Sequence, residues 1–304
     1  MRLMQHKREA YWFYRYLSIF YDKLVNPLFW TEHMRETALD QGGWTQADQL
    51  QVIDVGSGTG FTTEGIVKRV PAANVSCVDQ SPHQMSHAKA KTALQDCKFQ
   101  VGDAEDIPYP TDSFDRYVSA GSIEYWPHPQ QGINESYRVL KSGGKALMIG
   151  PIEPQNAISK FIANAWMLFP PEADYHRWYQ EAGFTDLQWT YVRPHWQKNE
   201  RYGIALIGTK PAPGLSPNAE AVAQQARQDQ EESGKMSLGR RILFFFRLLI
   251  GSFFGGLFIP MALIAHLLAP LRGIKGPRQP LNKWQIGVLV LTAVLIGGLI
   301  YWIL

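Results

Sequence analysis

Residues 51–60, QVIDVGSGTG, lead an apolar strand directly into a glycine-rich turn. Asp54 lies near the end of the strand, and Gly56, Gly58 and Gly60 follow at alternate positions. Glycine is needed where a ligand approaches the backbone closely or where φ is positive. The dinucleotide fingerprint has the spacing G-x-G-x-x-G and places pyrophosphate at a helix N-terminus. Here the spacing is G-x-G-x-G, and the adjacent carboxylate would repel pyrophosphate but suit a ligand with a cationic amino group.

Strands and helices are predicted to alternate on both sides of this turn. The predicted strands are 51–55, 74–79, 98–101, 116–120 and 145–150, the helices between them are 62–70, 84–93 and 130–140, and a closing antiparallel pair is formed by 186–192 and 203–209. This alternation predicts βαβ units, a parallel sheet with helices on both faces, and a ligand crevice at the carboxyl ends of the strands. The fold class is therefore α/β and Rossmann-like.

Two further acids follow the next two predicted strands. Asp79 ends the second strand, where a carboxylate can accept hydrogen bonds from both hydroxyls of a ribose. Asp103 follows the third strand, where it can accept a hydrogen bond from an exocyclic amine. One such acid alone is commonly a turn or cap residue. Three acids at successive strand ends, together with the glycine turn, favour a binding site instead.

The constellation resembles the class I S-adenosylmethionine (SAM)-dependent methyltransferases over roughly residues 45–210. In that family the glycine loop faces the methionine moiety, the second-strand acid binds ribose and the third-strand acid pairs with adenine. The resemblance therefore implies a SAM site, with S-adenosylhomocysteine as the product, formed by Asp54, Gly56, Gly58, Gly60, Asp79 and Asp103, and completed by Gln80, Ala104 and Ser119.

Longer stretches resemble a narrower family, the plant-type 2-methyl-6-phytylbenzoquinol (MPBQ/MSBQ) methyltransferases. The similarity runs from about residue 5 to residue 210 and includes SAGSIEYWP at 119–127. It implies C-methylation of a prenylated benzoquinol ring, with a phytyl or solanesyl tail, in tocopherol and plastoquinone synthesis. The chain departs from the plant pattern because no plastid transit segment is recognisable and the hydrophobic tail is longer. Both departures fit a cyanobacterial protein or a mature chain.

A general base is expected near the methyl acceptor, because the ring carbon of a quinol becomes nucleophilic when a hydroxyl is deprotonated. The candidates are Glu124 and His128 in the loop GSIEYWPHP, and His176 in YHRWY. Glu124 is the first choice, because it follows the fourth strand where the methyl end of the cofactor should open to the substrate. His128 and His176 are alternatively surface residues. Tyr125 and Trp126 either shield the sulfonium by cation–π contact or pack in the core.

The C-terminal region is strongly apolar. Residues 285–304, QIGVLVLTAVLIGGLIYWIL, contain no charge over twenty residues, which is enough to cross a bilayer core as a helix. A transmembrane helix is therefore predicted there. Residues 242–271 are also apolar but are interrupted by Arg247, Pro260 and His266. Because basic loops stay cytoplasmic, the basic residues on both sides of this segment favour a re-entrant or in-plane segment over a second span.

These patterns predict four parts: an aromatic N-terminal region at 1–44, a catalytic domain at 45–210, a polar linker at 211–239 and a hydrophobic membrane tail at 240–304. The aromatic helix of the first part either packs on the domain or acts as a lid that dips into lipid. We expect the catalytic domain on the cytoplasmic or stromal side of a cyanobacterial membrane or plastid inner envelope. The expected partners are a prenylated quinol and a lipid bilayer.

Charge and cysteine content exclude other classes. The net charge of +3 is too small to indicate a nucleic-acid partner. Two cysteines, Cys77 and Cys97, exclude a disulfide scaffold or a cysteine-rich zinc module, and buried thiols are favoured over a bridge. The histidines lack paired spacing with carboxylates, so no metal is expected.

Two alternative functions remain open. One is methylation of another membrane lipid, such as a sterol or a ubiquinone or menaquinone precursor. The other is a SAM-binding membrane protein without catalysis, against which the intact set of three acids argues.

Overall fold

The computed structural model describes residues 26–157, 159–160, 169–233, 259–274 and 280–303, with single residues at 239, 242, 245, 246 and 249. The predicted aromatic helix within residues 1–25 lies outside the described residues, as does most of 240–258. The predicted boundaries of the four parts stay predictions.

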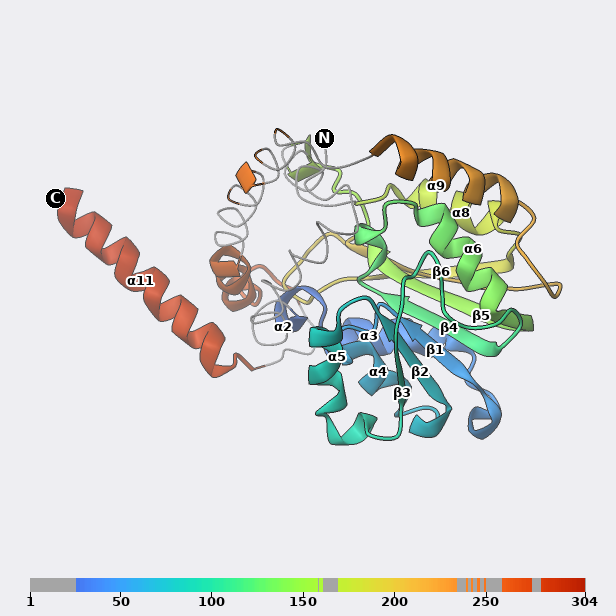
Figure 1. The fold of residues 1–304 in the computed structure, drawn as a ribbon. Helices are drawn as coiled ribbons and strands as arrows, with labels where there is room; N and C mark the ends of the chain where they lie inside the picture. The colour runs from blue at the N-terminus through green and yellow to red at the C-terminus, as the bar shows by residue number, and fades with distance from the viewer. Residues whose placement is uncertain are drawn as a thin grey trace.

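Within the described residues, a sheet of seven strands forms in the order β3-β2-β1-β4-β5-β7-β6 (Figure 1). The strands are β1 (Val52–Val55), β2 (Val75–Asp79), β3 (Lys98–Val101), β4 (Phe114–Ala120), β5 (Leu140–Pro151), β6 (Thr185–Val192) and β7 (Gly203–Thr209). The first five strands are parallel, and β7 is antiparallel to both β5 and β6. The predicted α/β sheet and its closing antiparallel pair are confirmed.

Helices cover both faces of the sheet, as expected (Figure 1). The helices are α2 (Asn26–Phe29), α3 (Glu32–Leu39), α4 (Phe61–Ile66), α5 (Pro82–Lys89), α6 (Pro129–Val139), α8 (Glu172–Glu181), α9 (Ala219–Ser233) and α11 (Lys283–Ile303). One core packs α3, α4 and α5 on one face, with Met34 and Ile66 buried there. The other core packs α6 and α8 on the opposite face, with Ile133 and Tyr179 buried. β1 is buried throughout, because it is central and covered on both sides.

Two segments differ from the sequence prediction. The turn expected before the fifth strand, at 142–144, is an irregularity within β5, which begins at Leu140 and pairs with β4 on both sides of it. Gly143 adopts a positive φ of 79° there. The stretch 211–239, predicted as a linker, contains α9. It lacks an apolar stripe, but its Ala, Gln, Glu and Arg residues are strong helix formers.

The C-terminal region forms a helix where one was predicted. α11 extends away from the sheet in Figure 1 and contains neither Asp nor Glu. Among the described residues, no helix meets the combined length and hydropathy needed for a membrane span. The predicted transmembrane helix at 285–304 is therefore not confirmed.

A small apolar cluster joins this region to α2 and the connection between β6 and β7. Leu28 of α2 packs with Leu263 from the helical segment 259–268 and with Val288 of α11. Trp196, in the connection between β6 and β7, packs against the cluster and donates a hydrogen bond from its indole N–H to the carbonyl of Leu28, at 2.8 Å. The predicted thiols, Cys77 and Cys97, are free and buried.

Candidate active site

A cavity opens at the carboxyl ends of the central parallel strands. Its walls come from the turn after β1, the ends of β2 and β4, the loop after β3 and the start of α3, and include Trp30, Thr31, Arg35, Gly56, Gly58, Asp79, Gln80, Asp103, Ala104, Glu105, Gly121, Tyr125 and Trp126. Its volume of about 120 Å³ is roughly ten times what one buried water needs. The cavity can therefore hold a ligand of many atoms.

At two positions of the turn, close packing leaves no room for a side chain and therefore requires glycine. Gly56 has a φ of +74°, and a Cβ there would lie 2.5 Å from the Cβ of Ser122. Gly60 has a φ of +83°, and its Cβ would lie 2.5 Å from a methyl carbon of Leu94. Gly56 and Gly58 line the cavity, whereas Gly60 lets the turn pack against its neighbours and is absent from the wall.

Asp79 fastens the glycine turn to the end of β2. One carboxylate oxygen accepts the backbone N–H of Gly58 at 2.8 Å, and the other accepts that of Ser81 at 2.8 Å. Burial raises the pKa of Asp79 to about 6, and these two hydrogen bonds oppose the rise. Asp79 and Gln80 both line the cavity.

The loops after β3 and β4 are tied together beside this wall. The carboxylate of Asp103 accepts the N–H of Glu105 at 2.9 Å, and Asp103 and Ala104 line the cavity. The side chain of Glu105 accepts the backbone N–H of His128 at 2.6 Å. Glu105 was not predicted, and its position next to Asp103 was the only signal for it in the sequence.

Asp54 and Ser119 lie behind the cavity wall and do not line it. The Asp54 carboxyl is fully buried, and one oxygen accepts the hydroxyl of Thr63 at 2.6 Å. The other has no hydrogen-bond partner among the described residues. Burial raises the pKa of Asp54 to about 7, and nearby Asp79 adds to the rise. Ser119 donates its hydroxyl to the carbonyl of Val55 at 2.7 Å.

None of the three candidate bases lines the cavity, but Glu124 lies between the lining residues Ser122 and Tyr125 in the loop after β4. Its side chain is buried, and one carboxyl oxygen has no hydrogen-bond partner among the described residues. A Cβ at Gly121 would lie 3.8 Å from the other oxygen and 3.3 Å from the indole nitrogen of Trp30. Burial raises the pKa of Glu124 to about 8.

The two histidine candidates do not line the cavity. His128 immediately precedes α6. His176 lies on α8, where its ring packs edge-on against Trp189, 4.6 Å between centroids, and lies 3.8 Å from Glu172. Among the residues that the structure describes, no cluster of His, Cys, Asp and Glu has the arrangement of a metal site.

The chain is similar in sequence to known proteins and in fold to solved structures. A family model described as "Methyltransferase domain" matches residues 53–148. The chain is 55% identical to the chloroplastic 2-methyl-6-phytyl-1,4-hydroquinone methyltransferase of Arabidopsis thaliana, over 71% of this chain and 65% of that protein. It is 53% identical to the enzyme of that name numbered 1 in Oryza sativa subsp. japonica, over 71% of this chain and 67% of the other. The chain belongs to this methyltransferase family.

The chain thus spans about two thirds of the length of these family members. A solved structure, the geranyl diphosphate C-methyltransferase of Streptomyces coelicolor A3(2) in complex with Mg²⁺, geranyl diphosphate and S-adenosyl-L-homocysteine, has a TM-score of 0.51 at 15% identity. The aligned region covers 59% of this chain and 77% of the solved chain. This likeness concerns the fold, which is that of the methyltransferase family.

One wall of the cavity was not anticipated from the sequence. Trp30, Thr31 and Arg35, at the start of α3, close it on the side of the glycine turn. Thr31 caps α3 by accepting the N–H of Met34 at 3.3 Å. A capping threonine is the sequence feature from which the start of this helix could have been predicted. In this family member the start of α3 is therefore part of the site.

Replacing Asp54 by Asn should change how stability depends on pH. Asp54 ionises near pH 3.8 in the unfolded chain and near 7 in the folded protein. Between these values only the folded protein retains the proton, so rising pH destabilises the wild type. We expect Asp54→Asn to gain stability over the wild type by up to about 4 kcal/mol across this pH range. Urea unfolding at several pH values measures the difference.

Asp96→Asn, at an exposed site, is the matched control and should show a constant difference. A pH-independent difference for Asp54→Asn as well would contradict the assigned ionisation of Asp54.

Proposed function

We propose that this protein transfers a methyl group from SAM to a ring carbon of a prenylated benzoquinol, 2-methyl-6-phytyl- or 2-methyl-6-solanesyl-benzoquinol. The observation that carries the proposal is 55% identity to a relative named for the phytyl reaction. A cavity lined by both acids and aromatic rings agrees with it, because the two ligands differ in polarity. Such a reaction belongs to tocopherol and plastoquinone synthesis.

The polar side of the cavity suits the methyl donor. Under this proposal Asp79 accepts the ribose hydroxyls, with Gln80 beside it, and Asp103 and Ala104 contact the adenine; all four residues line the cavity. SAM, when bound, supplies an activated methyl group on a sulfonium. Gly56 and Gly58 leave the backbone of the turn open toward the amino-acid end of such a ligand.

The aromatic side of the cavity suits the acceptor ring. Trp30, Tyr125 and Trp126 line it, and their rings exclude water and can face a sulfonium by cation–π contact. Methyl transfer to carbon needs the nucleophile held in line with the methyl group, and rigid aromatic walls provide such alignment. Trp126 is buried among core residues, which fixes its ring.

Glu124 is our choice for the general base. One buried carboxyl oxygen has no partner among the described residues, and the other lies beside Gly121, which lines the cavity. An acceptor hydroxyl at this wall would donate to the carboxylate. Tyr175 of α8 and Tyr202, next to β7, are the titratable groups whose charges interact with Glu124. Glu124 is preferred to His128 and His176 because its carboxyl is buried beside the lining residue Gly121.

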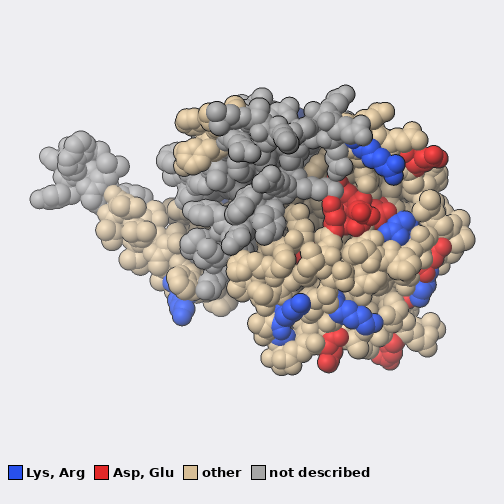
Figure 2. All heavy atoms as spheres, viewed as in Figure 1, with Lys and Arg blue, Asp and Glu red and all other residues tan. Residues whose placement is uncertain are grey.

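We also propose that the C-terminal region contacts lipid. Exposed apolar side chains gather on 259–271 and on the described part of α11: Met261, Leu267, Leu271, Ile286, Val290, Leu291, Val294 and Leu295. Figure 2 draws this part of α11 without acidic side chains. A prenyl tail gains roughly 0.8 kcal/mol per buried CH₂ and therefore stays in the bilayer. A lipid-bound enzyme, facing the cytoplasm or stroma, would meet its acceptor there.

Methyl transfer to isolated acceptors tests the function directly. Purified protein with labelled SAM should methylate phytyl- and solanesyl-benzoquinols, and mass spectrometry and NMR should locate the methyl group on the ring. Transfer to a sterol or a menaquinone precursor alone would favour another lipid methyltransferase, and SAM binding without turnover of any acceptor would favour a non-catalytic protein.

The variant Asp79→Ala tests whether Asp79 contributes to SAM binding. It removes charge-assisted hydrogen bonds worth about 1.5–3 kcal/mol, so calorimetry should show SAM affinity falling about tenfold or more. Asp96→Ala should bind SAM like the wild type, since Asp96 is exposed outside the cavity.

Glu124→Gln should lower kcat by about 10²- to 10⁴-fold, the usual contribution of a general base, with SAM affinity nearly unchanged.

A base acts when it is deprotonated. Because the pKa of Glu124 is raised to about 8, wild-type kcat/KM should rise with pH up to about that value. The Gln variant should lack this rise. His176→Gln is the control and should retain the wild-type profile. A Glu124→Gln enzyme with wild-type kcat would rule out this base.

Replacing Leu291, Val294 and Leu295 together by Gln should reduce vesicle binding. These side chains are 59%, 64% and 64% exposed, so the change leaves the cluster around Leu28 intact. Each loses burial worth about 1.5–3 kcal/mol in lipid, which predicts at least a tenfold lower partition. Flotation with vesicles measures it, and Leu215→Gln, another exposed leucine, is the control. Equal flotation of the triple variant would place the anchor elsewhere in the chain.

A further inference from the structure

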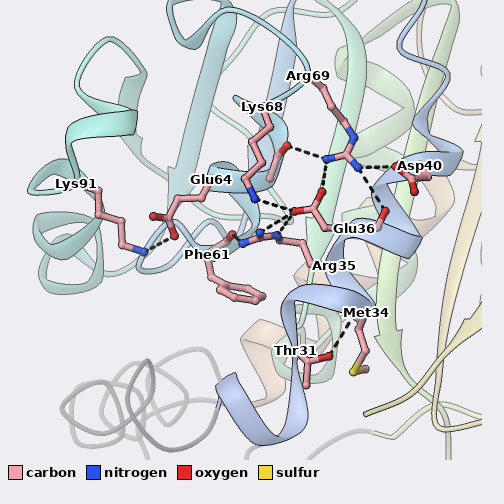
Figure 3. Close-up of polar contacts among 11 residues, drawn as sticks. Thr31, Met34, Arg35, Glu36, Asp40, Phe61, Glu64, Lys68, Arg69 and Lys91 are labelled. Carbon is pink, nitrogen blue, oxygen red and sulfur yellow. Dashed lines mark hydrogen bonds and ion pairs between the residues drawn. The ribbon is translucent and has the colours of Figure 1, made fainter. Parts of the chain in front are cut away.

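A cluster of five charged side chains stands beside the glycine turn, between α3 and α4 (Figure 3). Glu36 pairs with Arg35 at 2.7 Å, with Arg69 at 2.6 Å and with Lys68 at 3.3 Å. Arg69 also pairs with Asp40 at 2.5 Å. Three cations and two carboxylates leave the cluster with one excess positive charge.

Arg35 is the member of the cluster that reaches the cavity. Its side chain is 3% exposed, its guanidinium lies over the ring of Phe61 at 4.6 Å, and one terminal nitrogen donates to the carbonyl of Phe61 at 2.8 Å. Gly65 of α4 makes room for it, because a Cβ there would lie 2.8 Å from the Nε of Arg35. The guanidinium is therefore held in one place between two helices.

The guanidinium retains hydrogen-bonding capacity. Of its five N–H groups, two donate to Glu36 and one to Phe61. One N–H on each terminal nitrogen is left without a partner among the described residues. Two such groups on one planar fork match the two oxygens of a carboxylate.

Charge is separated across the cavity. Asp79, Asp103 and Glu105 line the side formed by β2 and β3, whereas Arg35 is the one Lys or Arg among the described lining residues. A ligand with hydroxyls and an amine at one end and a carboxylate at the other would be oriented by this separation. The reverse orientation would place its carboxylate against three acids.

We propose that Arg35 binds the α-carboxylate of the amino-acid end of SAM and of S-adenosylhomocysteine. This inference rests on the proposed function, because it takes these molecules as ligands. With ribose at Asp79, the amino-acid end extends along the glycine turn toward α3, where Arg35 is the cation available. A charge-assisted pair with a guanidinium suits a half-desolvated carboxylate.

Glu36 acts as a positioning residue for Arg35. Burial would raise the pKa of Glu36, but hydrogen bonds from Arg69 and Arg35 outweigh it and lower the pKa to about 2. Glu36 therefore stays ionised and fixes the fork. Because Arg69 and Lys68 also pair with Glu36, the charge of Arg35 is not fully neutralised within the protein.

Calorimetry with a ligand pair tests the assignment. S-adenosylhomocysteine and its decarboxylated analogue, which differ only in the carboxylate, are titrated into wild type, Arg35→Gln and Lys68→Gln. Wild type should prefer the carboxylate-bearing ligand by about tenfold to a hundredfold. Arg35→Gln should lose most of this preference and bind the analogue like the wild type. Lys68→Gln removes a cation from the same cluster outside the cavity wall, and should keep the preference.

The outcomes separate the two proposals. If the wild type binds neither ligand, the proposed function fails and this inference fails with it. If the wild type binds both ligands equally, or if Arg35→Gln keeps the wild-type preference or weakens both ligands alike, the Arg35 assignment alone is overturned. Should Arg35→Gln not fold, Arg35→Lys keeps the charge but lacks the fork. It should show a reduced preference, and an unchanged preference would overturn the assignment.

Discussion

The hydrogen bond from the Gly58 N–H to the Asp79 carboxylate is the contact on which the cavity depends. It joins the turn after β1 to the end of β2, so that the carboxyl ends of these two neighbouring strands form one continuous part of the cavity wall. The second oxygen of Asp79 holds Ser81, which caps α5 by accepting the N–H of Gln84. One carboxylate thus orders the turn and the start of a helix, while its exposed side faces the cavity.

Burying several carboxylates near one cavity is electrostatically unfavourable for their ionised forms. Burial raises the pKa values of Asp54, Asp79 and Glu124 to about 7, 6 and 8. The ionised form of each acid is stabilised less by its surroundings than it would be by water. Such raised pKa values are common at sites that bind ligands. Asp54 shows why strand-end acids need not touch the ligand. Its carboxyl lies behind the wall, hydrogen-bonded to Thr63, and the neighbouring Asp79 adds to the rise in its pKa.

The sequence was informative wherever local rules decide structure. Glycines at alternate positions after an apolar strand predicted the turn, and strand-end acids predicted Asp79 and Asp103. Local patterns could not show that Asp54 faces away from the cavity, since this depends on which sheet face α4 covers. They also could not show that the Ser119 hydroxyl hydrogen-bonds to the carbonyl of Val55 on the neighbouring strand. Nor could they bring Arg35 to the glycine turn, because that contact joins residues 26 positions apart. His176 looked functional only because the packing of α8 against Trp189 was unknown.

The start of α3 connects the cavity to the apolar C-terminal region. Leu28 and Phe29 pack with Leu263 and Val288, and the next residues along the chain, Trp30 and Thr31, line the cavity. Trp196 fixes this segment through the carbonyl of Leu28. The C-terminal helices therefore pack on residues that directly precede the lining residue Trp30. Under the proposed function, an acceptor delivered from lipid would reach the cavity past Trp30, the lining residue next in the chain to this contact.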